Sequence, residues 1–121
     1  MDMGSREYRG HVIVTLSGEL DLVYAADVAA ALRIIARRCP RIIADLADLE
    51  FIDCRGAAAL VSGRWHARLA GGDLLLAAPP PRVRRVLAVN RPTSTFAVHS
   101  SVEAAGARAA SPRGTAPGRT G

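Results

Sequence analysis

Residues 53–56 of the chain read Asp-Cys-Arg-Gly and bring a carboxylate, a thiol and a guanidinium together just before a helical pattern. A helix N-terminus leaves N–H groups unpaired and favours negative charge. Cys54 there can act as a nucleophile, because the positive end of the helix dipole stabilises a thiolate. Asp53 can act as a general acid or base, or accept N–H bonds as the helix cap. Asp21 stands in the same position before an earlier helical stretch, where it caps that helix or contacts a partner.

Neither Cys54 nor Asp53 has an evident catalytic partner in the sequence. A cysteine phosphatase needs a phosphate-binding loop with an arginine several residues after the cysteine, whereas Arg55 follows Cys54 directly. The sequence near Asp53 offers no second catalytic group. We therefore expect no enzyme, with Cys54 as a small packing residue and Asp53 as a cap. A small enzyme using Cys54 or Asp53 is the alternative hypothesis.

The metal-binding residue types are scattered. Cys39 and Cys54 lack the spacing of a zinc motif, and His11, His66 and His99 lie far apart in the chain. Because a structural zinc site needs about four well-placed ligands, no metal and no other cofactor is expected. In a cytoplasmic protein, both thiols are expected to be reduced.

The net charge of +5 does not predict nucleic-acid binding. Every basic residue is an arginine, and Arg108, Arg113 and Arg119 fall in the last stretch, which has no acid after Glu103. The five aromatic residues are too scattered to form stacking platforms. No apolar run approaches the ~20 residues that cross a membrane, and the acidic N-terminus does not resemble a signal peptide. The expected location is the cytoplasm, with no membrane partner.

Apolar residues alternate, or follow one another directly, in several segments of strand length. Between these segments, apolar residues recur at spacings of three and four, which is typical of amphipathic helices. A further strand around Tyr8, turned at Arg9 and Gly10, would precede these segments. On the helix predicted over residues 56–70, the residues expected to face the core are Ala57, Leu60, Val61, Trp65 and Leu69. The predicted strands are residues 11–17, 41–46, 73–78 and 96–99. The predicted helices are residues 24–38, 56–70, 81–89 and 102–110.

Strands that alternate with helices indicate an α/β domain with right-handed crossovers. We expect a single domain over residues 1–110, with a mostly parallel mixed sheet of about four to five strands and about four helices. The pattern leaves open whether the helices cover one face of the sheet or both. Residues 111–121, rich in Arg, Gly, Pro and Ala, are expected to be a disordered tail.

Three segments in order resemble the STAS domain, in particular the stand-alone bacterial anti-sigma factor antagonists. They are residues 16–21 (Leu-Ser-Gly-Glu-Leu-Asp), residues 45–56 with their Asp-Cys-Arg-Gly ending, and residues 72–76 with 81–87. The resemblance covers residues 6–105, and it implies helices on one side of the sheet. It also implies a partner, an anti-sigma factor of the histidine-kinase-like ATPase type, whose capture frees a sigma factor.

The resemblance further implies a partner-binding surface made of Asp21, Asp53, Cys54, Arg55 and Gly56. In the family, a serine or threonine at the start of the second helix is phosphorylated by the kinase, which ends the interaction. Here Arg55 occupies that position and has no hydroxyl group. The phosphorylation switch is therefore expected to be missing at residues 53–56.

Arg55 in a first helical turn opposes the helix dipole, at a cost of up to about 1 kcal/mol. Three interpretations stay open: a surface ion pair with Asp53 or Asp21, a contact with a partner carboxylate, or a charge that abolishes binding. A structural or scaffold role for the whole domain is a further alternative, and the oligomeric state is undetermined.

Overall fold

The computed structural model describes residues 1–110, so the predicted tail lies outside the described residues. One sheet forms the centre of the fold, in the order β1-β2-β3-β5-β6, and β4 pairs with the far end of β2. Only β1 is antiparallel to its neighbour. The strands are β1 Asp2–Tyr8, β2 His11–Leu20, β3 Arg41–Asp45, β4 Leu49–Ile52, β5 Asp73–Ala77 and β6 Val98–His99.

The predicted α/β class with a mostly parallel sheet is confirmed, and the sheet has six strands instead of four to five. The additional strand is β4, which is absent from the predicted strands. The first half of β2 pairs with β3, and its end pairs with β4 through Gly18, Glu19 and Leu20. A long β2 thus carries two short parallel partners along one edge.

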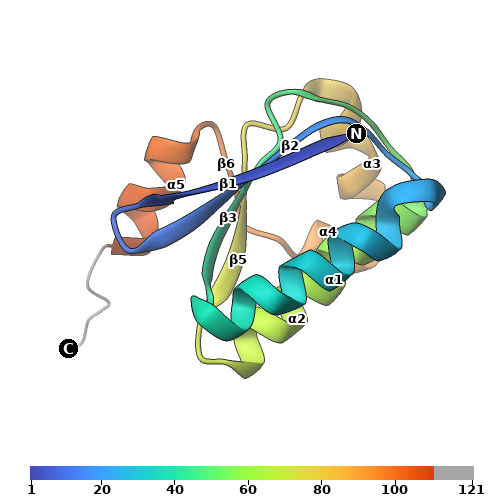
Figure 1. Ribbon diagram of the computed structural model, residues 1–121. Coiled ribbons are helices and arrows are strands. Elements are labelled where there is room, and N and C mark those ends of the chain that lie inside the picture. The colour runs from blue at the N-terminus through green and yellow to red at the C-terminus, as the bar shows by residue number, and fades with distance from the viewer. Residues whose placement is uncertain (111–121) are drawn as a thin grey trace.

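Helices cover both faces of the sheet. As Figure 1 shows, α1, α2, α3 and α4 lie on one side and α5 on the other, so the implication that all helices share one side is wrong for α5. The four-residue α4 is absent from the predicted helices and lies between the helix predicted over residues 81–89 and the strand predicted over residues 96–99. The helices are α1 Leu22–Arg38, α2 Cys54–Leu69, α3 Pro81–Val89, α4 Arg91–Ser94 and α5 Val102–Ala110.

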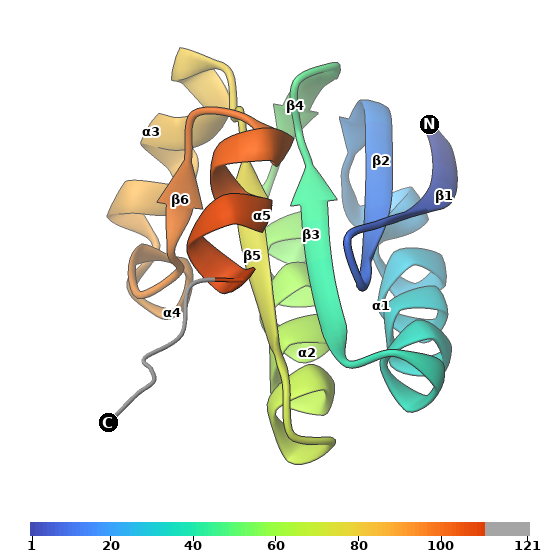
Figure 2. The same ribbon diagram turned by 90° about the vertical axis from the view of Figure 1, so that its left-hand side faces the viewer.

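Two apolar layers result from this arrangement. The larger one lies between the sheet and α1, α2 and α3, and the smaller one joins Ile13, Ile43 and Ala77 to Val102 and Ala105 of α5. In Figure 2, α5 crosses in front of the sheet while α1 and α2 lie behind it. Burial on both faces explains why the central strands are continuous apolar runs.

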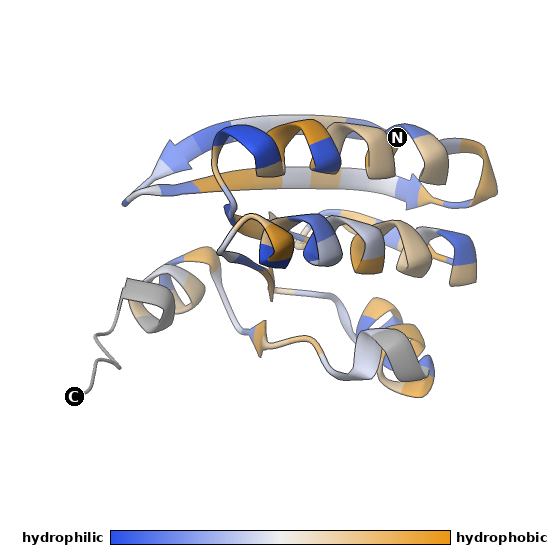
Figure 3. Cartoon of the chain, turned by 90° about the horizontal axis from the view of Figure 1, so that it is seen from below, coloured by the Kyte–Doolittle hydropathy of each residue, from blue (hydrophilic) through white to orange (hydrophobic). Residues whose placement is uncertain are grey.

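Apart from Leu60, the buried face of α2 is made of glycine and alanine. A Cβ added at Gly63 would lie 2.6 Å from Leu32 Cδ1 of α1, so the two helices pack closely at this point. Figure 3 shows α1 and α2 side by side. Leu60 is buried as predicted, whereas Trp65 and Leu69 are 62% and 66% exposed, so their predicted burial is wrong. Leu60 is thus the one large side chain among the buried residues of α2, and the others are glycine and alanine.

His11 lies at the start of β2 and is buried, with 2% of its surface exposed. Its Nδ1 lies 3.3 Å from the Arg9 carbonyl oxygen. Burial lowers the pKa of His11 below 6.5, and the charge of Arg41 lowers it further. The fold therefore favours the neutral imidazole.

This preference predicts a pH-dependent stability. Because the unfolded chain binds a proton more readily at His11, the stabilisation from the neutral ring is complete above about pH 6.5 and is lost as the pH falls through the lower folded pKa. The free energy of unfolding, measured by urea denaturation at pH 7.5 and pH 5, should fall more for wild type than for His11→Gln. Equal losses in the two proteins would contradict this.

Candidate functional site

The ends of β2 and β4 place two helix N-termini side by side. Leu20 and Ile52 are paired in the sheet, and each is followed by an aspartate that begins a helix. Since both strands run in the same direction, Asp21 and Asp53 meet at the carboxyl edge of the sheet, where α/β folds commonly place their binding sites. The predicted helix caps are confirmed at both positions.

The Asp53 carboxylate binds both helices at once. Its Oδ1 accepts the Gly56 N–H of its own helix at 2.9 Å, and its Oδ2 accepts the Leu22 N–H of α1 at 3.1 Å. Asp21 Oδ1 accepts the Val23 N–H at 3.0 Å. Both Asp53 oxygens are thus engaged with backbone donors, which weakens the hypothesis of a general base.

Gly56 allows α2 to approach the sheet. A Cβ at this position would overlap the Leu20 carbonyl oxygen and lie 2.8 Å from Leu20 Cγ. Gly56 is buried, so it shapes the surface from beneath instead of reaching a partner through it.

Cys54 and Arg55 are both exposed in the first turn of α2, so the prediction of Cys54 as a small packing residue is wrong. The Arg55 guanidinium forms no ion pair with Asp21 or Asp53, since the only ion pair among the described side chains joins Arg64 to Asp73. The interpretation of Arg55 as half of a surface ion pair is therefore wrong. Neither first helical turn contains an acid, so Arg55 adds its charge to two positive dipole ends.

Three exposed apolar side chains that sequence reasoning missed lie at the same end of the molecule. Leu22 and Val23, in the first turn of α1, are 62% and 72% exposed, and Phe51 of β4 is 45% exposed. Phe51 pairs with Glu19 in the sheet, one residue before Leu20. The available signal was two apolar residues directly after the Asp21 cap, outside the period of the helix. We call the set of Asp21, Leu22, Val23, Phe51, Asp53, Cys54 and Arg55 the helix-end surface.

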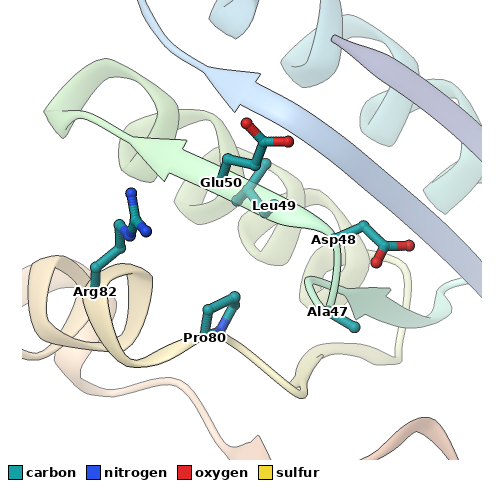
Figure 4. A pocket seen from close by; sticks show the side chains of 6 residues that line it. All are labelled: Ala47, Asp48, Leu49, Glu50, Pro80 and Arg82. Atoms are coloured by element: carbon teal, nitrogen blue, oxygen red, sulfur yellow. The ribbon is translucent and has the colours of Figure 1, made fainter.

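A hollow of about 440 Å³ lies next to β4, between the β3–β4 loop and the start of α3. In Figure 4, Glu50 and Arg82 stand on opposite sides of it, with Asp48 at the loop. It contains no histidine, cysteine or hydroxyl side chain. Among the described residues, no group of three or more His, Cys, Asp or Glu could hold a metal ion, and no helix is long and apolar enough to span a membrane.

The geometry and the sequence identify one class of protein. The sequence profile of the STAS domain matches residues 3–105, and the chain therefore belongs to the STAS domain family. The comparison with curated proteins found no match.

Solved structures show the same fold. An anti-sigma factor antagonist from Mycobacterium paratuberculosis has a TM-score of 0.81 at 22% identity, with 91% of this chain and 94% of that chain covered. The antagonist SpoIIAA, a Bacillus cell fate determinant, has in its unphosphorylated form a TM-score of 0.74 at 22% identity, with 88% and 95% covered. The murine anion transporter Slc26a9 has a TM-score of 0.67 at 17% identity, and the match covers 86% of this chain but only 18% of the transporter. The fold thus occurs both in small antagonists and inside larger proteins.

The double cap of Asp53 generates a stability prediction. Replacing an aspartate cap by alanine costs about 0.5–2 kcal/mol per helix. Because Asp53 serves two helices, Asp53→Ala should lower the free energy of unfolding about twice as much as Asp21→Ala, with Asp53→Asn in between. Urea denaturation at neutral pH measures all three. Equal losses for Asp53→Ala and Asp21→Ala would show that the bond to Leu22 contributes nothing.

Proposed function

We propose that this chain is an anti-sigma factor antagonist that binds an anti-sigma factor through the helix-end surface and thereby frees a sigma factor. The partner would be a kinase of the histidine-kinase-like ATPase type, and the place of action the cytoplasm. The observation that carries the proposal is the exposure of Leu22, Val23, Phe51 and Arg55 at the adjoining ends of β2 and β4, where α1 and α2 begin. Membership of the STAS family and the fold shared with two antagonists support it.

The chemistry of this surface suits protein recognition. When a partner covers exposed apolar side chains, the complex is stabilised by about 25 cal/mol per Å² of apolar area removed from water. Arginine is enriched among the residues that dominate binding energy, and its planar group can hold a carboxylate through two hydrogen bonds. Since the Asp21 and Asp53 carboxylates are turned to backbone N–H groups, Arg55 keeps its charge available for a carboxylate of the partner.

The absence of a hydroxyl at residues 53–56 supports an antagonist without the usual switch. SpoIIAA has been solved in phosphorylated and unphosphorylated forms. In this chain Asp53, Cys54, Arg55 and Gly56 offer no acceptor to a serine or threonine kinase. We propose that partner binding is therefore not ended by phosphorylation at this position.

The same residues favour binding over catalysis. The Asp53 carboxylate is held by two backbone donors, so it is already committed as a cap. Within the part of the chain that the structure describes, no base is hydrogen-bonded to the exposed Cys54 thiol. A nucleophile needs such a base or a comparable activating group.

The first test is affinity capture from the native cytosol, with bound proteins identified by mass spectrometry. Wild type should retain a histidine-kinase-like ATPase, and Leu22→Asp should lose it because a charge replaces a covered apolar contact. Val89→Asp is the matched control, since Val89 is 79% exposed on α3, and it should retain the partner.

An Arg55→Ser variant in the same experiment separates the two remaining roles of Arg55. Capture of the kinase by wild type supports a permanently engaged antagonist. Capture by the serine variant alone would show that Arg55 has switched the site off. Capture by neither protein, or equal loss in Leu22→Asp and Val89→Asp, would overturn the proposed surface.

The second test addresses phosphorylation. After incubation with the captured kinase and ATP, peptide mass spectrometry should find no phosphate on residues 53–56 of wild type, because Arg55 has no hydroxyl group to modify. Arg55→Ser restores the acceptor and should become phosphorylated, which shows that the kinase is active. A phosphorylated wild-type peptide from this segment would contradict the proposal.

A further inference from the structure

A second concave site lies at the opposite end of the sheet from the helix-end surface. It is a cavity of about 540 Å³, within the range of small-molecule sites. Strands β2, β3 and β5 contribute their first residues, His11, Arg41 and Asp73, and the turn after α2 closes it through Gly71 and Gly72. Because parallel strands begin at this edge, the cavity gathers side chains that are far apart in the sequence.

The cavity lining contains more basic than acidic side chains. Arg41 and Arg68 both line it, and neither forms an ion pair among the described side chains. The acidic residue of the lining, Asp73, is already bound to Arg64, with Arg64 Nε 3.0 Å from Asp73 Oδ1. The same Asp73 oxygen also accepts the Leu74 N–H at 2.8 Å. Arg41 and Arg68 therefore line the cavity without an ion pair, and the one carboxylate of the lining is already shared with Arg64.

Arg41 and His11 both line the cavity and lie close enough to interact electrostatically. The Arg41 guanidinium lies near the β1–β2 turn, since a Cβ at Gly10 would be 3.6 Å from its Nη1. Its charge and the burial of the ring keep the pKa of His11 below the ordinary value. A neutral imidazole beside a guanidinium leaves the positive charge of the cavity on the arginines.

Part of the remaining lining is apolar. Ile42, Leu75 and Ala97 line the cavity together with His99. Ile42 is fully buried and Leu75 is half-buried, so this wall is part of the packed sheet. A site with two cationic groups at its rim and an apolar wall suits a ligand with an anionic head and a compact apolar body.

We infer that this cavity binds a small organic anion, with its phosphate or carboxylate head held by Arg41 and Arg68 and its apolar body against Leu75 and Ala97. The site is separate from the helix-end surface and does not rest on the function proposed for that surface. The domain would then bind a small molecule at one end of the sheet and its protein partner at the other.

The test is a titration of the full chain followed by two-dimensional ¹H–¹⁵N NMR. Phenyl phosphate and benzoate are the probes, and whichever binds more tightly identifies the head group. Saturable shifts are expected at the amides of Gly72, Leu75 and Ala97. Phenol, which lacks the charge, should produce none at the same concentration, and inorganic phosphate should bind more weakly because it lacks the apolar body.

Variants connect the binding to the two arginines. Arg41→Gln and Arg68→Gln should each weaken binding about tenfold, as expected for the loss of a hydrogen bond to a charged group. Arg84→Gln removes the same charge from an exposed position on α3 and should leave the affinity unchanged. Spectra of the free variants, unchanged away from the cavity, confirm that each one is folded.

Three outcomes would overturn the inference. One is the absence of saturable shifts with both probes in wild type, a result that needs no variant. The second is undiminished binding in the Arg41→Gln and Arg68→Gln proteins, and the third is an equal loss in Arg84→Gln. Because the titration contains no kinase, its failure leaves the proposed antagonist function untouched, and the converse holds as well.

Discussion

The hydrogen bonds of the Asp53 carboxylate are the interaction on which the site depends. One side chain accepts a backbone N–H from its own helix and another from α1, so it joins two helix ends that follow two paired strands. Gly56 brings α2 close enough for this, since any Cβ there would overlap the Leu20 carbonyl oxygen. The first turns of α1 and α2, with their exposed side chains, are thereby joined to each other.

Close packing at Gly56 continues along α2 and decides which of its side chains meet solvent. Apart from Leu60, the buried residues of α2 are glycine and alanine, and a Cβ at Gly63 would collide with Leu32 of α1. Trp65 and Leu69 lie on the outer face and are exposed.

The sheet separates two chemically different ends. At its carboxyl edge, apolar side chains and one arginine surround two capped helices, which suits a protein partner. At its amino edge, two arginines and an apolar wall surround a cavity that suits a small anion. Parallel strands with right-handed crossovers produce this separation, because every βα turn falls at one edge and every αβ turn at the other.

The sequence alone predicted the α/β class, the main strands and helices and the two aspartate caps, because periodicity and capping are local properties. The resemblance to the STAS domain also led to the prediction that Arg55 stands where the family carries a serine or threonine. The sequence did not reveal β4, since a four-residue strand without alternation resembles a loop. The prediction that Trp65 is buried was wrong, since residue spacing does not reveal how close a neighbouring helix lies. Only the tertiary structure joined Asp53 to Leu22, exposed Phe51 beside them and gathered Arg41 and Arg68 around one cavity. These contacts link residues distant in the chain, and their geometry depends on packing that no local pattern encodes.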